Sequence, residues 1–153
     1  MKTAPTTNIK LRVGDDGHRE VFDIARNRYV ALTPEEWVRQ HVLHHLHFEL
    51  GYPLELIQVE GAITLNGMTR RCDIVVYDQQ VRPFITVECK KESVPLTQKV
   101  LDQACRYNLV LQVPYLCITN GPQQLCYQVN FEQIKRRKAF CVFASEKVVQ
   151  HFD

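Results

Sequence analysis

The stretch RCDIVVYDQQVRPFITVECKK, residues 71–91, holds two short apolar runs that each meet a charged side chain. The runs at 74–77 and 84–87 are rich in β-branched and aromatic residues, and the polar segment between them is turn-like, which predicts two neighbouring strands. Glu88 and Lys90 follow the second run two residues apart, so they are expected on the same side of their strand. The chain therefore places an acid and a base at one strand end.

A third charged residue, Asp73, lies inside the otherwise apolar segment CDIVVY, residues 72–77. Regular alternation along this strand predicts one face formed by Cys72, Ile74 and Val76, and another formed by Asp73, Val75 and Tyr77. A carboxylate on a partly buried face costs free energy unless it is paired or bound to a metal. We therefore expect the two strands to bring Asp73, Glu88 and Lys90 together at one edge of the sheet. The alternative is a structural ion pair between Asp73 and Lys90, with Glu88 merely solvated.

These residue types have a chemical use at such an edge. Asp73 and Glu88, together with the backbone carbonyl of Cys89, form an all-oxygen site suited to Mg²⁺, for which Mn²⁺ can substitute. The metal would polarise a phosphodiester and lower the pKa of a bound water, while Lys90 would orient that water or neutralise developing charge. The tripeptide E-x-K alone is common, so the prediction depends on its context in the strands.

The composition is that of one folded domain: the 153 residues are 45% hydrophobic and 24% charged. No apolar stretch approaches the ~20 residues of a membrane span, and the N-terminal residues lack the apolar segment of a secretory signal, so a cytoplasmic protein is expected. The six cysteines are scattered without a C-x-x-C motif, which favours reduced core residues over a disulfide framework. A net charge of +2 excludes a uniformly basic, histone-like binder.

The segments before this stretch predict a hairpin and a helix. Residues 8–13 and 19–24 flank the turn-rich segment GDDGH, which is typical of a β-hairpin. A helix is expected from Thr33, as its N-cap, to Gly51, with Glu36 completing a capping box.

The remaining pattern predicts three consecutive strands, a helix and a further strand. The Asn66-Gly67 dipeptide is a strong hairpin signal between the first two of these strands. Residues 94–112 have the period of an amphipathic helix, and strands are expected at 115–119 and 124–129. The order is that of a single α/β domain with a mixed sheet.

These residues resemble the PD-(D/E)xK nuclease superfamily, whose αβββαβ core carries an Asp on one strand and (D/E)-x-K on the next. More narrowly, the chain resembles the N-terminal nuclease domain of type I restriction enzyme R subunits over roughly residues 28–130. Cys72 stands where the Pro of the motif's name would precede the Asp, a frequent departure. Three further motifs of that family occur in order, namely P-E-E-x-V-R-Q at 34–40, Q-x-x-x-Y at Gln103 and Tyr107, and T-N-G at 119–121.

The resemblance implies a restriction-endonuclease-like fold and a Mg²⁺-dependent DNA nuclease. The αβββαβ core is expected at residues 33–130, with an N-terminal β-hairpin extension at 1–32 and a C-terminal extension at 131–153, all within one domain. The chain ends where an R subunit continues into its helicase motor, so the domain is expected to stand alone. It contains no Walker A motif, so it is not expected to drive ATP-dependent translocation.

The resemblance also implies roles for residues on the two helices. Gln103 and Tyr107 are four residues apart on the second helix, and the family's pattern places them near the active-site edge. The structural alternative is that Tyr107 packs in the core and accepts a hydrogen bond from Gln103. One Glu of the first helix is implied as a further ligand. Glu35 is preferred because it lies on the inward face, and Glu36, already in the capping box, is the reserve.

DNA is the expected partner, contacted through its phosphates, with a homodimer or a partner subunit supplying specificity. Basic runs of this kind are also typical of solvated surface. The side chains expected to contact phosphate are Arg70, Arg71, Lys91, Lys135, Arg136, Arg137 and Lys138.

Other functions remain open at this point. A nucleic-acid-binding or assembly module would keep the fold without cleavage, although clustered carboxylates near phosphate argue against it. A junction resolvase would require a symmetric dimer. His41 and His45 are four residues apart and could chelate zinc, but no close pair of cysteines accompanies them in the sequence. The histidines of the first helix are therefore expected at its surface, with His45 half-buried.

Overall fold

The computed structural model describes residues 8–129, apart from the side chains of Arg106, Tyr107, Leu109 and Val110. Its strands form a three-stranded sheet in the order β1-β2-β3 and a five-stranded sheet in the order β4-β5-β6-β7-β8. The strands are β1 (Leu11–Val13), β2 (Arg19–Asp23), β3 (Arg28–Ala31), β4 (Ile57–Leu65), β5 (Met68–Tyr77), β6 (Pro83–Cys89), β7 (Tyr115–Thr119) and β8 (Gln124–Gln128). The helices are α1 (Pro34–His44), a π-helical turn (His45–Glu49), a 3₁₀ turn (Leu54–Leu56) and α2 (Gln98–Leu111).

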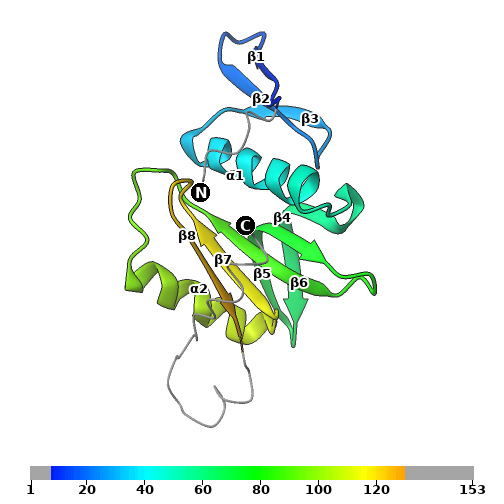
Figure 1. The fold of residues 1–153 in the computed structure, drawn as a ribbon, viewed down its shortest axis with the longest axis vertical. Helices are drawn as coiled ribbons and strands as arrows, with labels where there is room; N and C mark the ends of the chain where they lie inside the picture. Colours follow the sequence, from blue (N-terminus) through cyan, green and yellow to red (C-terminus); the bar gives the residue numbers. More distant parts are fainter. Residues whose placement is uncertain (1–7, 130–153) are drawn as a thin grey trace.

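The five-stranded sheet is mixed and lies between the two helices (Figure 1). β6 and β7 are parallel, and the other neighbouring strands are antiparallel. Ile74 and Val76 of β5 pack in a cluster with Val38 of α1. Val75, the residue between them, packs with Leu111 of α2, and successive residues of a strand point to opposite faces. The predicted αβββαβ core with a mixed sheet is therefore confirmed.

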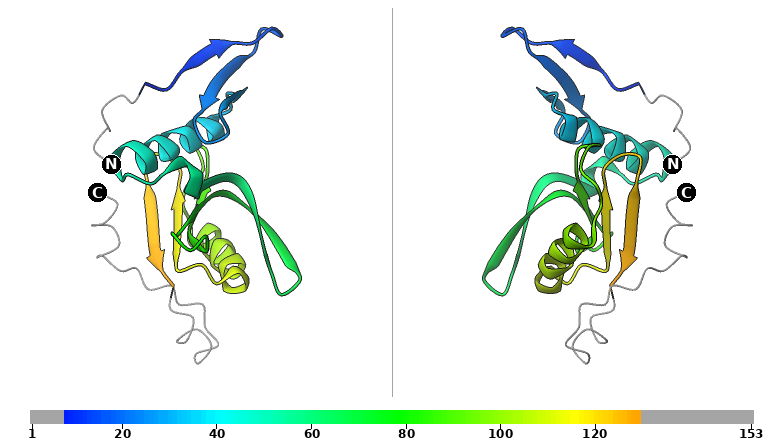
Figure 2. Two further views of the ribbon diagram at one scale, coloured as in Figure 1. Left: turned by 90° about the vertical axis from the view of Figure 1, so that its right-hand side faces the viewer. Right: turned by 90° about the vertical axis from the view of Figure 1, so that its left-hand side faces the viewer.

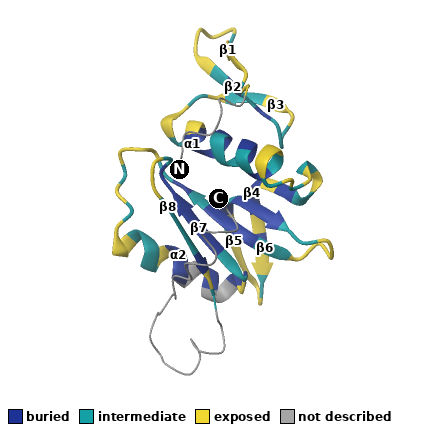
Figure 3. Cartoon of the chain, viewed as in Figure 1, coloured by how far each residue is buried: buried dark blue, intermediate teal, exposed yellow. Residues whose placement is uncertain are grey.

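The N-terminal sheet lies beyond α1, away from the five-stranded sheet (Figures 1 and 2). The predicted hairpin is confirmed as β1 and β2, and β3 adds a third strand that the sequence prediction did not include. Every residue of β1 is exposed, whereas β6 and β7 are largely buried (Figure 3). The N-terminal sheet therefore contributes little to the main core. The predicted C-terminal extension, 131–153, lies outside the described residues.

The helix ends follow from local signals. α1 begins after Thr33, and the helical segment stops before Gly51, which has a φ of 76° that favours glycine. α2 begins at Gln98 rather than at 94 because Thr97 is its N-cap and accepts the Val100 N–H. No helix within residues 8–129 is both long and apolar enough to span a membrane.

Replacing Thr33 by alanine should destabilise the protein by about 1 kcal/mol. Thr33 Oγ1 accepts the Glu36 backbone N–H at 3.0 Å, and alanine leaves that donor without its cap. Urea denaturation measures the change in the free energy of unfolding. Thr33→Ser is the matched control because it keeps the hydroxyl, and an equal loss in both variants would contradict the capping role.

The predicted alternation along residues 72–77 is wrong at Cys72 and at Asp73. Asp73 contacts Arg39 of α1, whereas Val75, with which it was expected to share a face, packs against α2. Cys72 packs with Val75 on the α2 side of the sheet instead of with Ile74. The cause lies in β4, where Glu60 has a φ of 52° and lies between the paired positions Val59↔Ile74 and Gly61↔Cys72. This left-handed residue interrupts the ladder opposite Asp73, so the strands exchange faces there.

Candidate active site

The end of the β5–β6 pair brings Asp73, Glu88 and Lys90 together. Asp73 Oδ2 accepts the backbone N–H of Cys89 at 2.7 Å, which fixes this carboxylate beside β6. Lys90 Nζ lies 3.8 Å from Glu88 Oε1, as expected for side chains two residues apart on one side of a strand. The backbone N–H of Lys90 donates to the Thr119 carbonyl of β7 at 2.8 Å. Because Lys90 contacts Glu88, the predicted alternative of an Asp73–Lys90 ion pair does not describe this site.

Glu88 is a partly buried carboxylate with charged neighbours of both signs. Burial and the neighbouring Asp73 charge raise the pKa of Glu88 from 4.5 to about 7, and Glu35 acts in the same direction. Lys90 and Arg70 oppose this shift. About a third of the Glu88 side chain, 34%, is exposed. The second carboxylate of the site is thus only partly ionised at neutral pH unless further positive charge approaches it.

Asp73 is held on its other side by Arg39 of α1. Arg39 Nη2 lies 3.2 Å from Asp73 Oδ1, and Arg39 Nη1 lies 3.0 Å from Glu36 Oε2. Only 6% of the Arg39 side chain is exposed. One buried guanidinium therefore connects the first turn of α1 with the carboxylate on β5.

This chain of charges continues to the N-terminal sheet. Arg26, between β2 and β3, donates to Asp23 Oδ2 and to Glu36 Oε1, each at 2.8 Å. Gln40 Nε2 donates to the same two carboxylates at 2.8 and 2.9 Å. We call this set the Arg39 network: Asp23, Arg26, Glu36, Arg39, Gln40 and Asp73.

Sequence reasoning assigned no role to Arg39 or Gln40, although both lie in the P-E-E-x-V-R-Q stretch. The available signal was their spacing, since Glu36, Arg39 and Gln40 are three and four residues apart and share one helix face. Three polar residues on a buried face require partners, and these come from β5 and from the turn after β2.

The two glutamates of α1 take different positions. Glu36 is 8% exposed and is bound by Arg26, Arg39 and Gln40, so its side chain serves the Arg39 network rather than a capping box. Glu35 has a side chain that is 45% exposed, and its charge contributes to the raised pKa of Glu88. Glu35 is therefore the α1 carboxylate whose charge acts on Glu88, in line with the sequence preference, while its role as a ligand stays a prediction.

A cavity of about 310 Å³ opens beside Glu88 on the α2 side of the sheet. Gln103 of α2 lines it, together with Arg70 and Arg71 of β5. The side chain of Tyr107 lies outside the described part of the structure, so its predicted role stays a prediction. The cavity combines a carboxylate, an amide and two guanidinium groups between the sheet and α2.

A family model described as the N terminus of the type I restriction enzyme R protein matches residues 34–139, more than half of the chain. The chain belongs to this family. A fragment assigned as an HsdR subunit of a type I restriction enzyme from Vibrio vulnificus YJ016 is similar in structure, with 23% identity and a TM-score of 0.48. The similarity covers 63% of this chain and 21% of that chain, so this chain spans about a fifth of that protein. No curated protein matches the sequence.

Asp73 and Glu88 supply the carboxylate oxygens that Mg²⁺ prefers as protein ligands. Among residues 8–129 no three His, Cys, Asp or Glu side chains form a group that could hold a metal. Mg²⁺ needs fewer protein ligands, because it keeps several waters and binds through one or two carboxylates. Asp73 Oδ1 and Oδ2 each have one partner, and a carboxylate oxygen has a second lone pair. Burial is the main cause of the raised pKa of Glu88, and the neighbouring Asp73 carboxylate adds to it.

The basic residues expected to contact DNA divide into two groups. Arg71 is mostly exposed, with its Nε donating to the Glu60 carbonyl at 3.3 Å, and Arg70 acts on Glu88 through its charge. Lys91 is exposed beside Lys90. The other group, Lys135, Arg136, Arg137 and Lys138, lies outside the described residues.

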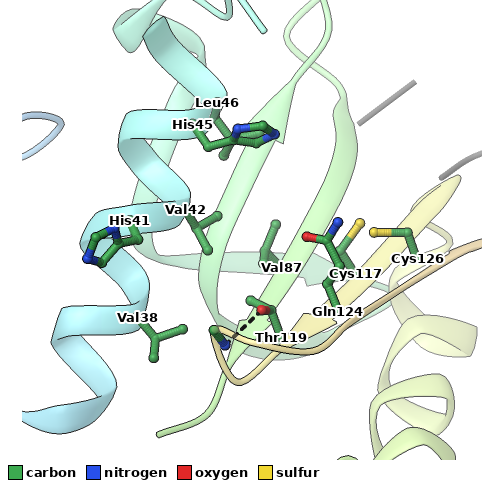
Figure 4. A pocket seen from close by; sticks show the side chains of 11 residues that line it. Val38, His41, Val42, His45, Leu46, Val87, Cys117, Thr119, Gln124 and Cys126 are labelled. Carbon is green, nitrogen blue, oxygen red and sulfur yellow. Dashed lines mark hydrogen bonds between the residues drawn. The ribbon is translucent and has the colours of Figure 1, made fainter. Parts of the chain in front are cut away.

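The histidines of the first helix differ partly from expectation. His44 is 3% exposed, and burial lowers its pKa, so the expectation of a surface position is wrong for this residue. His41 and His45 line a small cavity of about 50 Å³ whose far wall contains Cys117 and Cys126 (Figure 4). The fold thus forms a close pair of cysteines that the sequence spacing did not indicate. No three-residue metal group was found here among the described side chains.

Proposed function

We propose that this chain is a Mg²⁺-dependent DNA nuclease that hydrolyses phosphodiester bonds. The observation that carries the proposal is the convergence of Asp73, Glu88 and Lys90 at one strand end, in a chain of the R-protein N-terminal family. The raised pKa of Glu88 supports it, because strongly perturbed carboxylates in a cleft are typical of functional sites.

Asp73 and Glu88 would hold the metal with the Cys89 carbonyl, where Mg²⁺ supplies Lewis-acid activation of a phosphodiester and of a water. The chain's own contacts orient this set. The Cys89 N–H and Arg39 fix both oxygens of Asp73, and Lys90 lies against Glu88. Lys90 would also stabilise charge that develops on the phosphate.

Substrate binding is proposed to occur at the cavity beside Glu88. Arg70 and Arg71 line it, and Lys91 is exposed after the end of β6. Contacts of these cations with phosphate would release counterions, so affinity would fall steeply with salt. Gln103, on the opposite wall, would position the substrate.

Restriction enzyme R proteins belong to larger assemblies, and this chain spans about a fifth of the similar HsdR fragment. We therefore propose that DNA and either a partner subunit or a second copy of the chain are its partners. A domain of this size covers few base pairs, and a partner would supply sequence specificity.

A second candidate function is a DNA-binding module that does not cleave. It is favoured by the Arg39–Asp73 ion pair of 3.2 Å, because a guanidinium already neutralises one of the two carboxylates. The intact Lys90–Glu88 contact argues for the nuclease, since binding alone does not need a base beside a carboxylate.

Replacing Lys90 by methionine should lower DNA cleavage by about 100-fold without loss of folding. The Lys90 side chain is 32% exposed and that of its partner Glu88 is 34% exposed, so loss of this pair should cost little stability. Plasmid and linear DNA are incubated with the wild type in Mg²⁺ or Mn²⁺, with and without EDTA. Asp73→Ala is a poorer test because Asp73 also binds Arg39 and the Cys89 N–H.

Lys10→Met removes the same charge near β1 and is the matched control, expected to cleave like the wild type. Metal-dependent cleavage that is weak in Lys90→Met and normal in Lys10→Met supports the nuclease. A wild type that binds DNA with either metal but leaves it intact contradicts the nuclease and supports the binding module.

A further inference from the structure

Two cysteines face each other across the last two described strands. Cys117 of β7 is paired directly with Cys126 of β8 in the antiparallel register. Cys117 is 5% exposed, whereas Cys126 is only partly buried. Both are free thiols, and their sulfur atoms point toward one another at the wall of the small cavity (Figure 4).

The ladder geometry suits a covalent bond between them. The Val129 N–H donates to the Pro114 carbonyl, and the Asn120 N–H donates to the Gln123 carbonyl, at 2.9 and 3.1 Å. Hydrogen-bonded pairs alternate with non-hydrogen-bonded pairs in an antiparallel ladder, so Cys117 and Cys126 form a non-hydrogen-bonded pair. The Cα atoms of such pairs are about 4.5 Å apart, within the roughly 4.4–6.8 Å range of disulfides.

The other cysteines on the sheet lack this arrangement. Cys72 of β5 is paired with Gly61, and Cys89 of β6 is paired with Thr119. Neither of these residues has a cysteine directly opposite it in the ladder. Cys117 and Cys126 thus differ from these cysteines in register, because each lies directly opposite the other on adjacent strands.

We propose that Cys117 and Cys126 are a reversible redox site that a peroxide oxidises to a cross-strand disulfide. The Cys126 thiolate attacks one peroxide oxygen, the O–O bond breaks, and the leaving oxygen takes up a proton and departs as water. The Cys117 sulfur then attacks the Cys126 sulfenic acid, the S–O bond breaks, and a second water carries away the Cys117 proton. Two thiols are oxidised, and one peroxide is reduced to two waters.

Cys126 is the attacking residue because it is more accessible and because a hydrogen bond from the Cys117 thiol lowers its pKa. The bond would lock β8 onto β7, the strand whose Thr119 carbonyl accepts the Lys90 N–H. The proposal concerns thiol chemistry alone and does not depend on nuclease activity.

Thiol mapping of the full chain tests the proposal. The native protein is treated with hydrogen peroxide, alkylated, and digested with trypsin, which leaves both cysteines in the peptide from Tyr107 to Lys135. After oxidation this peptide should carry neither alkyl label, and its mass should be lower by two hydrogen atoms than that of the reduced, unlabelled peptide. Its labelling should fall at least about tenfold faster than that of the Cys105 peptide. A thiol reductant should restore labelling. Cys117→Ser should instead accumulate a sulfenic acid at Cys126, trapped by dimedone.

A second readout is thermal stability, because a bond with native geometry restricts the unfolded chain. The oxidised wild type should melt at a higher temperature than the reduced form, and Cys126→Ser should show no such shift. Retention of both labels while Cys105 is oxidised would overturn the proposal. So would a cross-link of either residue to Cys141, which joins two tryptic peptides, or a lower melting temperature of the oxidised protein.

Discussion

Replacing Glu88 by glutamine should abolish cleavage and, at pH 8, make the folded protein more stable. Burial and Asp73 raise the pKa of Glu88 from 4.5 to about 7, so the folded state prefers the protonated form. Its contribution to stability is fully present below about pH 4.5 and is lost as the pH rises through about 7. Glutamine has the same shape and no charge, so it removes this penalty above pH 7.

Exposure of Glu88 to solvent limits the size of this gain in stability. With 34% of the Glu88 side chain exposed, screening reduces the effect to about 1 kcal/mol in the free energy of unfolding. Cleavage should fall at least about 1,000-fold, because the carboxylate is a proposed metal ligand. A gain in stability with a loss of activity is the signature of a site that is strained for function.

Urea denaturation without divalent metal, at pH 5 and pH 8, measures the stability difference, which should be small at pH 5 and largest at pH 8. Glu92→Gln removes an exposed carboxylate four residues further along and serves as the control, with no change at either pH. Equal destabilisation of Glu88→Gln at both pH values would contradict the proposed electrostatics.

Metal binding gives a readout that is independent of cleavage. A cation that binds only the folded state raises the melting temperature. Mg²⁺ should therefore stabilise the wild type and should not stabilise Glu88→Gln. Normal DNA cleavage by Glu88→Gln would remove Glu88 from the site, whereas a missing Mg²⁺ shift in the wild type would argue for the non-cleaving module.

The position of Asp73 beside the strand end that carries Glu88 and Lys90 could be predicted, because it depends on local rules. Two adjacent strands and a two-residue period are enough to bring these residues to one edge. The exchange of faces at Asp73 could not be predicted, because it arises from the left-handed backbone at Glu60, on a different strand. Nothing in the sequence around residue 60 requires a φ of 52° there.

The contacts that escaped prediction join segments far apart in the chain. Arg39 contacts Asp73, 34 residues away, and Gln40 contacts Asp23, 17 residues away. Helical spacing shows that such side chains share a face, but their partners depend on how β2 and β5 pack against α1. The pairing of Cys117 with Cys126 likewise depends on the register of β7 and β8. The metal and the role of Tyr107 stay predictions.

Replacing Arg39 by methionine should destabilise the fold by about 3–5 kcal/mol, more than other single changes to this site. The Arg39 side chain is 6% exposed and lies between Glu36 and Asp73. Its loss leaves Asp73 without its counter-ion, whereas Glu36 keeps Arg26, and a partly buried uncompensated charge is costly. Urea denaturation at pH 7 measures the effect.

Arg82→Met is the matched control on the surface. Arg82 Nε lies 3.0 Å from Asp78 Oδ2, but the Arg82 side chain is 71% exposed, so its ion pair should contribute little to stability. A loss as small for Arg39→Met as for Arg82→Met would show that the Arg39 network does not stabilise the site. The double variant Glu36→Leu with Arg39→Met should be less destabilised than the sum of its single variants. That double variant still leaves Asp73 without Arg39. A cleavage deficit that persists in it would therefore come from the position of Asp73 and not from a loss of stability.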